Sequence, residues 1–397
     1  MNKTICSVEK CTGCAACRDI CPKQCISMKG DDLDALHPII NTDKCIDCAL
    51  CEETCPNNIS LKFRHPQKVW AAWSNDDKIR NKSASGGIAY ELYRHWLSIG
   101  GVGFGVTYDI NNGCHFILIE KESDIEAVKN SKYTFSDTKG IYKVVKQKLN
   151  AGIPVLFIGV PCQVAGLFGY LKKDYENLFT VDIICHGMPP ATYLQQHIAK
   201  INQKTRKSAK RLSFRDPEFG TNTFTFTLRD DSNKLLYKKK VLNTDNYQLS
   251  YHRALIYREN CYSCSYARRE RLGDLTIGDF SGIGRCAPFM FERRNISCIL
   301  QNTDNGGKLL ANLTHIITLV ERPISEALNY EKQLNAPSVK HEKRYIFERE
   351  YKNSRNFNIA SDKALVKEKK IAIKTALVLN TKLFVYNILV MFGLKKR

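Results

Sequence analysis

Two short runs of cysteine carry the plainest chemical signal in this sequence. Each run holds four cysteines and a proline in the pattern C-x₂-C-x₂-C-x₃-C-P. Every position of the second run lies 34 residues after its counterpart in the first, which indicates an internal duplication. The two runs are Cys11, Cys14, Cys17, Cys21 and Pro22, and then Cys45, Cys48, Cys51, Cys55 and Pro56.

This spacing is typical of proteins that hold two [4Fe–4S] clusters. Three closely spaced thiolates bind three corners of one cubane, and the fourth cysteine of each run ligates the other cluster. Paired zinc sites would need four ligands in a closed site, not an exchange between repeats. We therefore predict a two-cluster ferredoxin module in residues 1–64. The predicted ligand sets are Cys11, Cys14, Cys17 and Cys55 for one cluster, and Cys45, Cys48, Cys51 and Cys21 for the other.

The composition fits a metal-binding protein of a reducing compartment. A chain of 397 residues has room for two or three domains, and 43% hydrophobic with 25% charged residues is ordinary for a soluble globular protein. The first ten residues lack the apolar stretch of an export signal, so we expect a cytoplasmic protein. Its 17 cysteines are therefore expected to be metal ligands or free thiols rather than disulfides.

The net charge of +20 falls to about +16 once two clusters, each carrying −2 with its thiolates, are counted. No nucleic-acid-binding motif accompanies this charge, so we do not expect nucleic acid as a partner. A basic surface is expected instead to attract acidic redox proteins or anionic lipid headgroups.

Beyond residue 65, apolar runs with strand character alternate with stretches of helical spacing. Such alternation is typical of an α/β core, whose functional residues gather at the strand ends. We predict strands at residues 68–73, 100–108, 115–120, 154–159 and 179–184, and helices at 88–98 and 164–171.

Four further cysteines could form a third metal site. Cys162 and Cys185 each follow a predicted strand, and Cys261 and Cys264 have the C-x₂-C spacing of a metal-binding turn. One interpretation is a third [4Fe–4S] cluster, and the other is four separately buried thiols. The remaining cysteines have no partner spacing and are predicted to be structural thiols: Cys6, Cys25, Cys114, Cys286 and Cys298.

The small-residue segment at residues 80–87 (RNKSASGG) also has two interpretations. It could be an exposed turn before the helix at 88–98, with Ser83 or Ser85 as the N-cap. It could instead be an anion cradle, in which Gly86 and Gly87 let backbone N–H groups at the start of that helix approach a phosphate.

From Trp70 onward the sequence resembles the coenzyme F420 (deazaflavin) hydrogenase/dehydrogenase beta-subunit family, which also includes flavin-dependent reductases of the plant chlorophyll pathway. Two positions depart from the family's pattern, Pro190 in place of a common serine and Ser281 within a usual Phe-Trp-Gly. These departures weaken the inference about which substrate is bound more than the inference that a flavin is bound. The matching motifs follow the family's order at residues 80–87 (RNKSASGG), 131–133 (SKY), 159–163 (GVPCQ), 182–187 (DIICHG), 214–216 (FRD), 261–266 (CYSCSY) and 273–280 (GDLTIGDF).

The resemblance implies an α/β domain that binds FAD and exchanges electrons between iron–sulfur clusters and a small-molecule substrate. It favours the third cluster, with ligands Cys162, Cys185, Cys261 and Cys264. We therefore expect an α+β ferredoxin module at residues 1–64, an α/β flavin-binding domain at 65–320, and additional helices in a basic extension at 321–397. The residues that the resemblance places near the flavin are Ser83, Ser85, Gly86, Gly87, Lys132 and Tyr133.

A general acid near the flavin would help to protonate a reduced product. His186, next to Cys185, is a candidate for this role, although a lone histidine is more often structural. Asp274 and Asp279 are equally well explained as turn or cap residues.

Two functional classes remain open. The chain is either a complete iron–sulfur flavin oxidoreductase or an electron-transfer subunit that serves a separate catalytic partner. Family members fused to a ferredoxin module often occur among surface-polysaccharide genes, so the resemblance does not imply a deazaflavin substrate. The expected partners are a redox protein or small electron carrier and a small-molecule substrate, and a homo-oligomer is also open.

The last part of the chain has helical texture at residues 340–352 and a basic tail at 364–397. In the tail, Ile373, Leu377, Phe384, Ile388 and Met391 recur at the intervals of an amphipathic helix. The uncharged run at 383–394 is too short to span a bilayer, so this helix could lie on the inner face of the membrane or contact the rest of the protein.

Overall fold

The computed structural model of the protein describes residues 4–241 and 244–375. Its N-terminal module contains an antiparallel hairpin, β1 (Ile26–Gly30) and β2 (Leu36–Ile40), and two short helices, α1 (Ala16–Ile20) and α2 (Leu50–Thr54). Each helix begins inside a cysteine run, after Ala15 or Ala49 in the left-handed region at φ 61° and 57°. Because these two alanines hold equivalent positions of the repeat, the backbone carries the same duplication as the cysteines.

The main sheet has nine strands in the order β14-β3-β13-β12-β8-β7-β4-β5-β6. The strands β12, β8, β7 and β4 run parallel to one another, and β3 shares their direction because β3 and β12 both pair antiparallel with β13. The strand bounds are β3 (Lys68–Ser74), β4 (Val102–Asp109), β5 (Gly113–Ile119), β6 (Ser136–Asp137), β7 (Val155–Gly159), β8 (Leu178–Ile183), β12 (Leu275–Asp279), β13 (Ser297–Gln301) and β14 (Ile317–Arg322).

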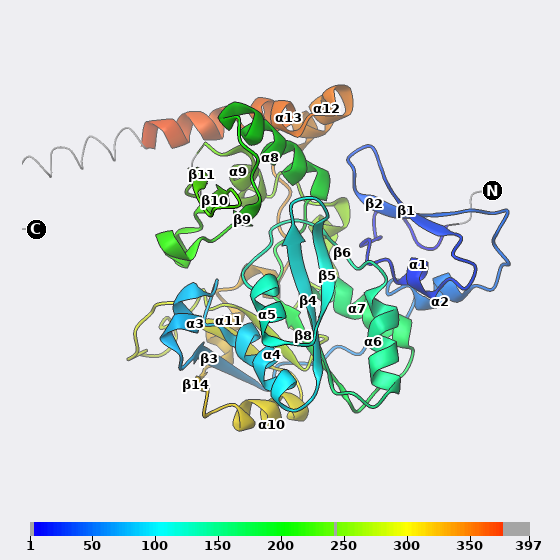
Figure 1. The fold of residues 1–397 in the computed structure, drawn as a ribbon, viewed down its shortest axis with the longest axis vertical. Coiled ribbons are helices and arrows are strands. Elements are labelled where there is room, and N and C mark those ends of the chain that lie inside the picture. Colours follow the sequence, from blue (N-terminus) through cyan, green and yellow to red (C-terminus); the bar gives the residue numbers. More distant parts are fainter. Residues whose placement is uncertain (1–3, 242–243, 376–397) are drawn as a thin grey trace, which may run out of the picture.

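Helices cover both faces of this sheet, as Figure 1 shows. Alternation along β7 sorts its side chains, because Leu156 and Ile158 pack on one face and Val155 and Phe157 on the other. The first face is covered by α4 (Ile88–Ser98), α5 (Glu122–Val128) and α10 (Asp304–Asn312), and the second by α6 (Ile141–Asn150), α7 (Pro161–Leu171) and α11 (Ile324–Leu328).

A second antiparallel sheet lies outside the main one, with strands in the order β11-β10-β9. Phe226 and Leu228 of its central strand join a core that buries Tyr193, Tyr247 and Phe357 from three of the surrounding helices. The elements are β9 (Arg211–Ser213), β10 (Phe226–Arg229), β11 (Leu235–Lys239), α8 (Ala191–Thr205), α9 (Asn246–His252), α12 (Arg344–Ser354) and α13 (Phe357–Ala364).

The five predicted strands and two predicted helices are all present in the α/β part, within a few residues at their ends. The segment at 80–87 differs, because Asp76 caps a short helix, α3 (Asp77–Lys82), whose last residues were predicted to be part of the turn. The turn is therefore confined to residues 83–87. The predicted boundary at residue 320 falls inside β14, which pairs with β3.

Most of the predicted amphipathic helix in the tail lies outside the described residues, since the description ends at residue 375. Within the described part of the chain, no helix has the length and apolar character needed to cross a membrane.

The ferredoxin module packs against α7, next to α6 (Figure 1). Two glycines of α7 allow this close approach. A Cβ atom on Gly169 would lie 2.2 Å from the Thr54 carbonyl oxygen, and one on Gly166 would lie 3.0 Å from Cys14 Cβ. The absence of side chains at these positions lets the module's backbone contact the helix.

The hairpin end of the module is held by the outer helices. Tyr193 Oη donates to the Leu33 carbonyl at 2.6 Å, and Tyr351 Oη donates to Asp34 Oδ2 at 2.6 Å. The module is therefore attached to both parts of the remaining chain.

Candidate functional site

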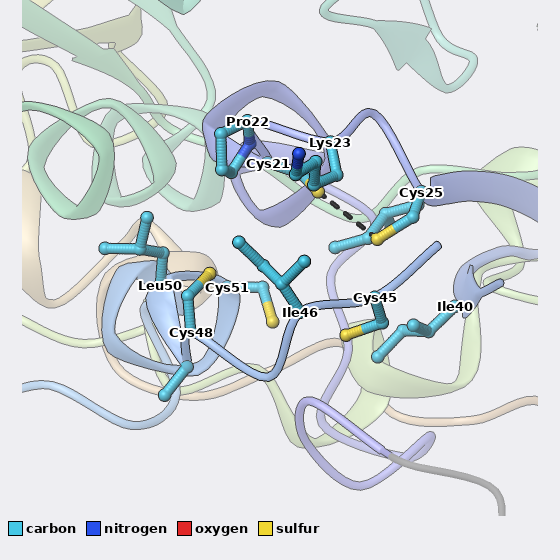
Figure 2. Close-up of a pocket in the computed structure, with 12 residues that line it drawn as sticks. Cys21, Pro22, Lys23, Cys25, Ile40, Cys45, Ile46, Cys48, Leu50 and Cys51 are labelled. Atoms are coloured by element: carbon cyan, nitrogen blue, oxygen red, sulfur yellow. Dashed lines mark hydrogen bonds between the residues drawn. The ribbon is translucent and has the colours of Figure 1, made fainter. Parts of the chain in front are cut away.

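Cysteines line three hollows in the described part of the chain, and the outermost lies wholly within the ferredoxin module. We call it the distal hollow. Figure 2 shows the cysteines around it, including Cys25, whose Sγ lies 3.4 Å from Cys21 Sγ. Cys48 is exposed, and the neighbouring Ile46 is 57% exposed, so this hollow lies at the protein surface. Its predicted ligands are all present: Cys21, Cys45, Cys48 and Cys51.

The second, or middle, hollow is lined by the other predicted set, Cys11, Cys14, Cys17 and Cys55. The structure thus brings together three cysteines of each run with the fourth cysteine of the other run, as the repeat predicted. Cys6 also lines the middle hollow. Cys6 and Cys25 were predicted to be structural thiols, and the spacing did not indicate that each would lie beside one of the hollows.

The third, or inner, hollow lies in the α/β part and is lined by Cys162, Cys185, Cys261 and Cys264. The four thiols are therefore not scattered. Cys162 lies in the first turn of α7 and Cys185 follows β8. Cys261 lies in a short 3₁₀ helix after α9, η3 (Glu259–Ser263), and Cys264 directly follows it.

The middle and inner hollows are neighbours. Thr12 lines both of them. On α7, Gly166 lies one turn after Cys162, and a Cβ atom on Gly166 would be 3.1 Å from Cys14 Sγ. The distal and middle hollows share a packed cluster that includes Cys17 and Cys55. The three hollows therefore form a row from the surface of the ferredoxin module into the α/β part.

The inner hollow lies at the edge of the sheet where the parallel strands end. Cys185 follows β8, and Gly187, two residues later, packs against Tyr257 so closely that a Cβ atom would lie 2.4 Å from its ring. Tyr257 contacts Tyr251 with ring centroids 5.3 Å apart, and Tyr251 stacks on Tyr133 at 4.6 Å. A row of aromatic rings thus connects the inner hollow with Tyr133.

Charged and polar side chains surround the far end of this row. Arg215 Nη1 donates to Asp279 Oδ2 at 2.6 Å, and its guanidinium lies 4.2 Å from the ring centre of Phe224. Asp279 is thus the ion-pair partner of Arg215 at the end of β12. Asp274, by contrast, accepts hydrogen bonds from Thr180, within the sheet.

His252 lies edge-on to Tyr133 and has a buried Nε2 without a hydrogen-bond partner. Burial, together with the charges of His186 and Arg215, lowers the pKa of His252 to about 4, so its ring is neutral near pH 7. Sequence reasoning missed His252, because nothing in the local sequence distinguishes it. His186 itself lines the inner hollow and is exposed, and its carbonyl accepts a hydrogen bond from Ser338 Oγ.

The polar groups of the 83–87 turn are bonded within the protein. Ser83 Oγ donates to the Ile79 carbonyl at 2.7 Å, and Ser85 Oγ donates to the Ile296 carbonyl at 2.9 Å. These hydroxyls are not N-caps of α4, which begins after Gly87 at φ 87° without a side-chain cap.

Close packing explains the glycine at position 86. The Gly86 N–H donates to Ser297 Oγ at 2.9 Å, and a Cβ atom there would lie 2.2 Å from the Ala72 carbonyl oxygen. Lys132 is the charged residue among the predicted flavin contacts. Its ammonium group donates to the Val128 and Lys129 carbonyls at the end of α5. Burial lowers the pKa of Lys132 to about 8.

The turn and the aromatic row nevertheless belong to one region. Asn295 Nδ2 donates to the Ser83 carbonyl, and Asn295 Oδ1 accepts from Thr221 Oγ1 at 2.9 Å. Thr221 in turn accepts a hydrogen bond from Arg215 Nε through its carbonyl, at 2.8 Å. Two linking residues therefore separate the turn from Arg215.

Comparison with known proteins gives two family matches. Residues 154–327 match the family described as the C terminus of the coenzyme F420 hydrogenase/dehydrogenase beta subunit, and residues 10–59 match the 4Fe-4S dicluster domain. Among solved structures, a chain of the xenon-derivatised F420-reducing [NiFe] hydrogenase complex from Methanosarcina barkeri is similar. It is 16% identical over 75% of this chain and 98% of that chain, with a TM-score of 0.43. No curated protein matches.

Proposed function

We propose that this chain is an iron–sulfur flavoprotein oxidoreductase, because residues 154–327 match the C terminus of the coenzyme F420 hydrogenase/dehydrogenase beta subunit and residues 10–59 match a 4Fe-4S dicluster domain. The family resemblance predicted from the motifs is confirmed over residues 154–327, and the chain is an iron–sulfur protein related to hydrogenase beta subunits. Bound clusters would supply one-electron transfer, and bound FAD would supply the two-electron step on a small substrate.

One observation carries the proposal. Three cysteine-lined hollows form a row that begins at exposed Cys48 and ends at the sheet edge beside Tyr257, Tyr251 and Tyr133. Functional groups of α/β proteins gather at this edge, where the parallel strands end. A path for single electrons that leads to a site at the sheet edge is the arrangement that the proposed reaction needs.

The residues around the inner hollow fit an iron–sulfur cluster. Four cysteine sulfurs are the ligand set that such a cluster requires, and the Met188 N–H faces Cys261 Sγ at 3.5 Å, as in hydrogen bonds to cluster sulfurs. Burial raises the pKa of Cys185 to about 12 and that of Cys261 to about 11. These thiols therefore stay protonated until metal binding displaces their protons.

The residues that fit a flavin are fewer than the sequence predicted. The polar groups of Ser83, Ser85, Gly86 and Lys132 already have partners within the protein. We propose that FAD is held by Gly87 at the start of α4, Tyr133 and His252, together with Arg215, whose guanidinium also pairs with Asp279. The unpartnered Nε2 of neutral His252 can accept or donate one hydrogen bond there, depending on its tautomer.

A flavin test follows from this assignment. Denaturing the anaerobically prepared protein is expected to release about one FAD per chain. Tyr133→Ala is expected to weaken FAD retention about tenfold, because one aromatic stacking contact is lost. Tyr345→Ala, an exposed tyrosine of α12, serves as the control and should retain FAD fully. Release of no flavin by the parent would contradict the flavoprotein proposal.

The second candidate function is an electron-transfer subunit for a separate catalytic chain. The exposure of Cys48 and Ile46 at the distal hollow favours a protein partner at that end, and it is compatible with both functions. The two differ in what the purified chain can do alone. Anaerobic turnover with a one-electron donor and candidate small molecules, including surface-polysaccharide precursors, tests this. Substrate turnover supports the oxidoreductase, and turnover only with an added partner chain supports the electron-transfer role.

A further inference from the structure

Arg258 lies between the middle and inner hollows and is only 2% exposed. Its Nη2 donates to the Leu36 carbonyl at 2.9 Å and to the Cys11 carbonyl at 3.2 Å, and its Nε donates to Asn260 Oδ1. The contact with the cysteine run requires glycine at position 13, where a Cβ atom would lie 2.9 Å from Arg258 Nη2. One arginine of the α/β part therefore reaches into the ferredoxin module.

Within the described residues, the guanidinium of Arg258 has no carboxylate partner, and its buried Nη1 has no hydrogen-bond partner. Other arginines with similar burial do form ion pairs, since Arg271 pairs with Asp182 and Arg322 pairs with Glu326. A buried charge without a counter-charge is strongly unfavourable. The hydrogen bonds to two carbonyls and the ring of Phe135 at 5.0 Å offset only part of that cost.

The cysteine sets on either side supply the missing negative charge. Arg258 lines the inner hollow, and its Nη2 donates a hydrogen bond to the carbonyl of Cys11, one of the cysteines that line the middle hollow. A [4Fe–4S] cluster with four thiolates carries −2 in its oxidised form and −3 after one-electron reduction. Each cluster near Arg258 therefore becomes more negative when it accepts an electron. A fixed cation nearby stabilises this reduced form.

We propose that Arg258 is a positioning residue that couples the middle and inner clusters, with its unpartnered Nη1 donating to a sulfur of the inner cluster. This inference rests on the proposed function, because it requires a cluster in the inner hollow. By stabilising the reduced form of both clusters, Arg258 makes them better electron acceptors than the distal cluster, where the lining cation is the exposed and solvent-screened Lys23. Electrons are thereby drawn from the surface toward the inner hollow.

The test is a redox titration of the anaerobically prepared full chain, with the clusters followed by electron paramagnetic resonance. Arg258→Gln removes the charge and is expected to lower the potentials of the middle and inner clusters. The equilibrium constant for electron exchange between either of these clusters and the distal cluster is expected to change at least tenfold. For one electron, this corresponds to a potential shift of about 59 mV. The distal cluster should not shift. Arg258→Lys keeps the charge and should restore most of the parent potentials, although it has no planar fork.

Iron and sulfide content are measured on the same samples, and Arg229→Gln is the control, since it removes a cation from β10 in the second sheet. A parent with iron for only two clusters lacks the inner cluster and overturns this inference, whereas a parent that releases no FAD contradicts the proposed function. A parent with three clusters whose potentials do not change in Arg258→Gln overturns the role of Arg258 alone. If Arg258→Gln loses iron or fails to fold, the role of the charge is judged from the cluster potentials of Arg258→Lys. Parent-like potentials in Arg258→Lys support the role of the charge, and potentials lowered as far as expected for glutamine overturn it.

Discussion

Replacing Cys261 with alanine is expected to remove about four iron atoms per chain and to leave the iron of the ferredoxin module in place. A cubane that loses one of four thiolate ligands becomes labile, and the residues described around the inner hollow offer no fifth cysteine. Because all four cysteines line this one hollow, the alanine variants of Cys162, Cys185 and Cys264 should show the same loss. Iron and acid-labile sulfide analysis of anaerobically prepared protein measures it.

The chain provides matched controls for this experiment. Cys114 and Cys298 are buried cysteines that line none of the three hollows, so Cys114→Ala and Cys298→Ala should leave the iron content unchanged. Equal iron in all six variants and the parent would mean that the inner hollow holds no cluster. The electron path would then have to run from the middle hollow directly to the sheet edge.

A leucine at position 169 is expected to separate the ferredoxin module from α7. Its Cβ atom would lie 2.2 Å from the Thr54 carbonyl, which belongs to backbone and cannot move aside easily. Overpacking of this kind costs about 1–3 kcal/mol, while the helix itself gains from the loss of glycine. The variant protein should therefore retain α7 and its full iron content. Electron transfer between the middle and inner clusters should be much slower than in the parent.

Rapid-freeze reduction kinetics, read by the spectra of the separate clusters, measures that transfer. Lys172→Ala is the control, because it removes only the exposed ion pair of Lys172 with Glu53 at the same contact. Electron transfer at the parent rate in Gly169→Leu would contradict the assigned path through α7.

The ferredoxin module was predictable because its chemistry is local. The spacing of each run sets which thiols can reach one cubane, and the structure brings together the two sets that the repeat predicted. The strands of the main sheet were predictable for a similar reason, since a buried parallel strand such as β7 is a continuous apolar run. The second sheet was missed. Its strands are short, and β10 pairs with β11 through an irregular register.

The site at the sheet edge was harder to predict, because it is built by contacts distant in sequence. Arg215 meets Asp279, and Tyr133 stacks on Tyr251, across separations that no local pattern encodes. The Gly86 position shows a different limit of sequence reasoning. A small-residue turn before a helix suggests a phosphate cradle, and the contact with the Ala72 carbonyl requires the same glycine, so the residue type alone does not distinguish the two roles.

The central claim is that three iron–sulfur centres lie in a row along this chain. Iron, acid-labile sulfide and zinc analysis of the anaerobically prepared full chain tests it most directly. The account predicts about twelve iron and twelve sulfide per chain and no stoichiometric zinc. About eight iron per chain would mean that the inner hollow holds no cluster. Stoichiometric zinc without sulfide would contradict the account altogether.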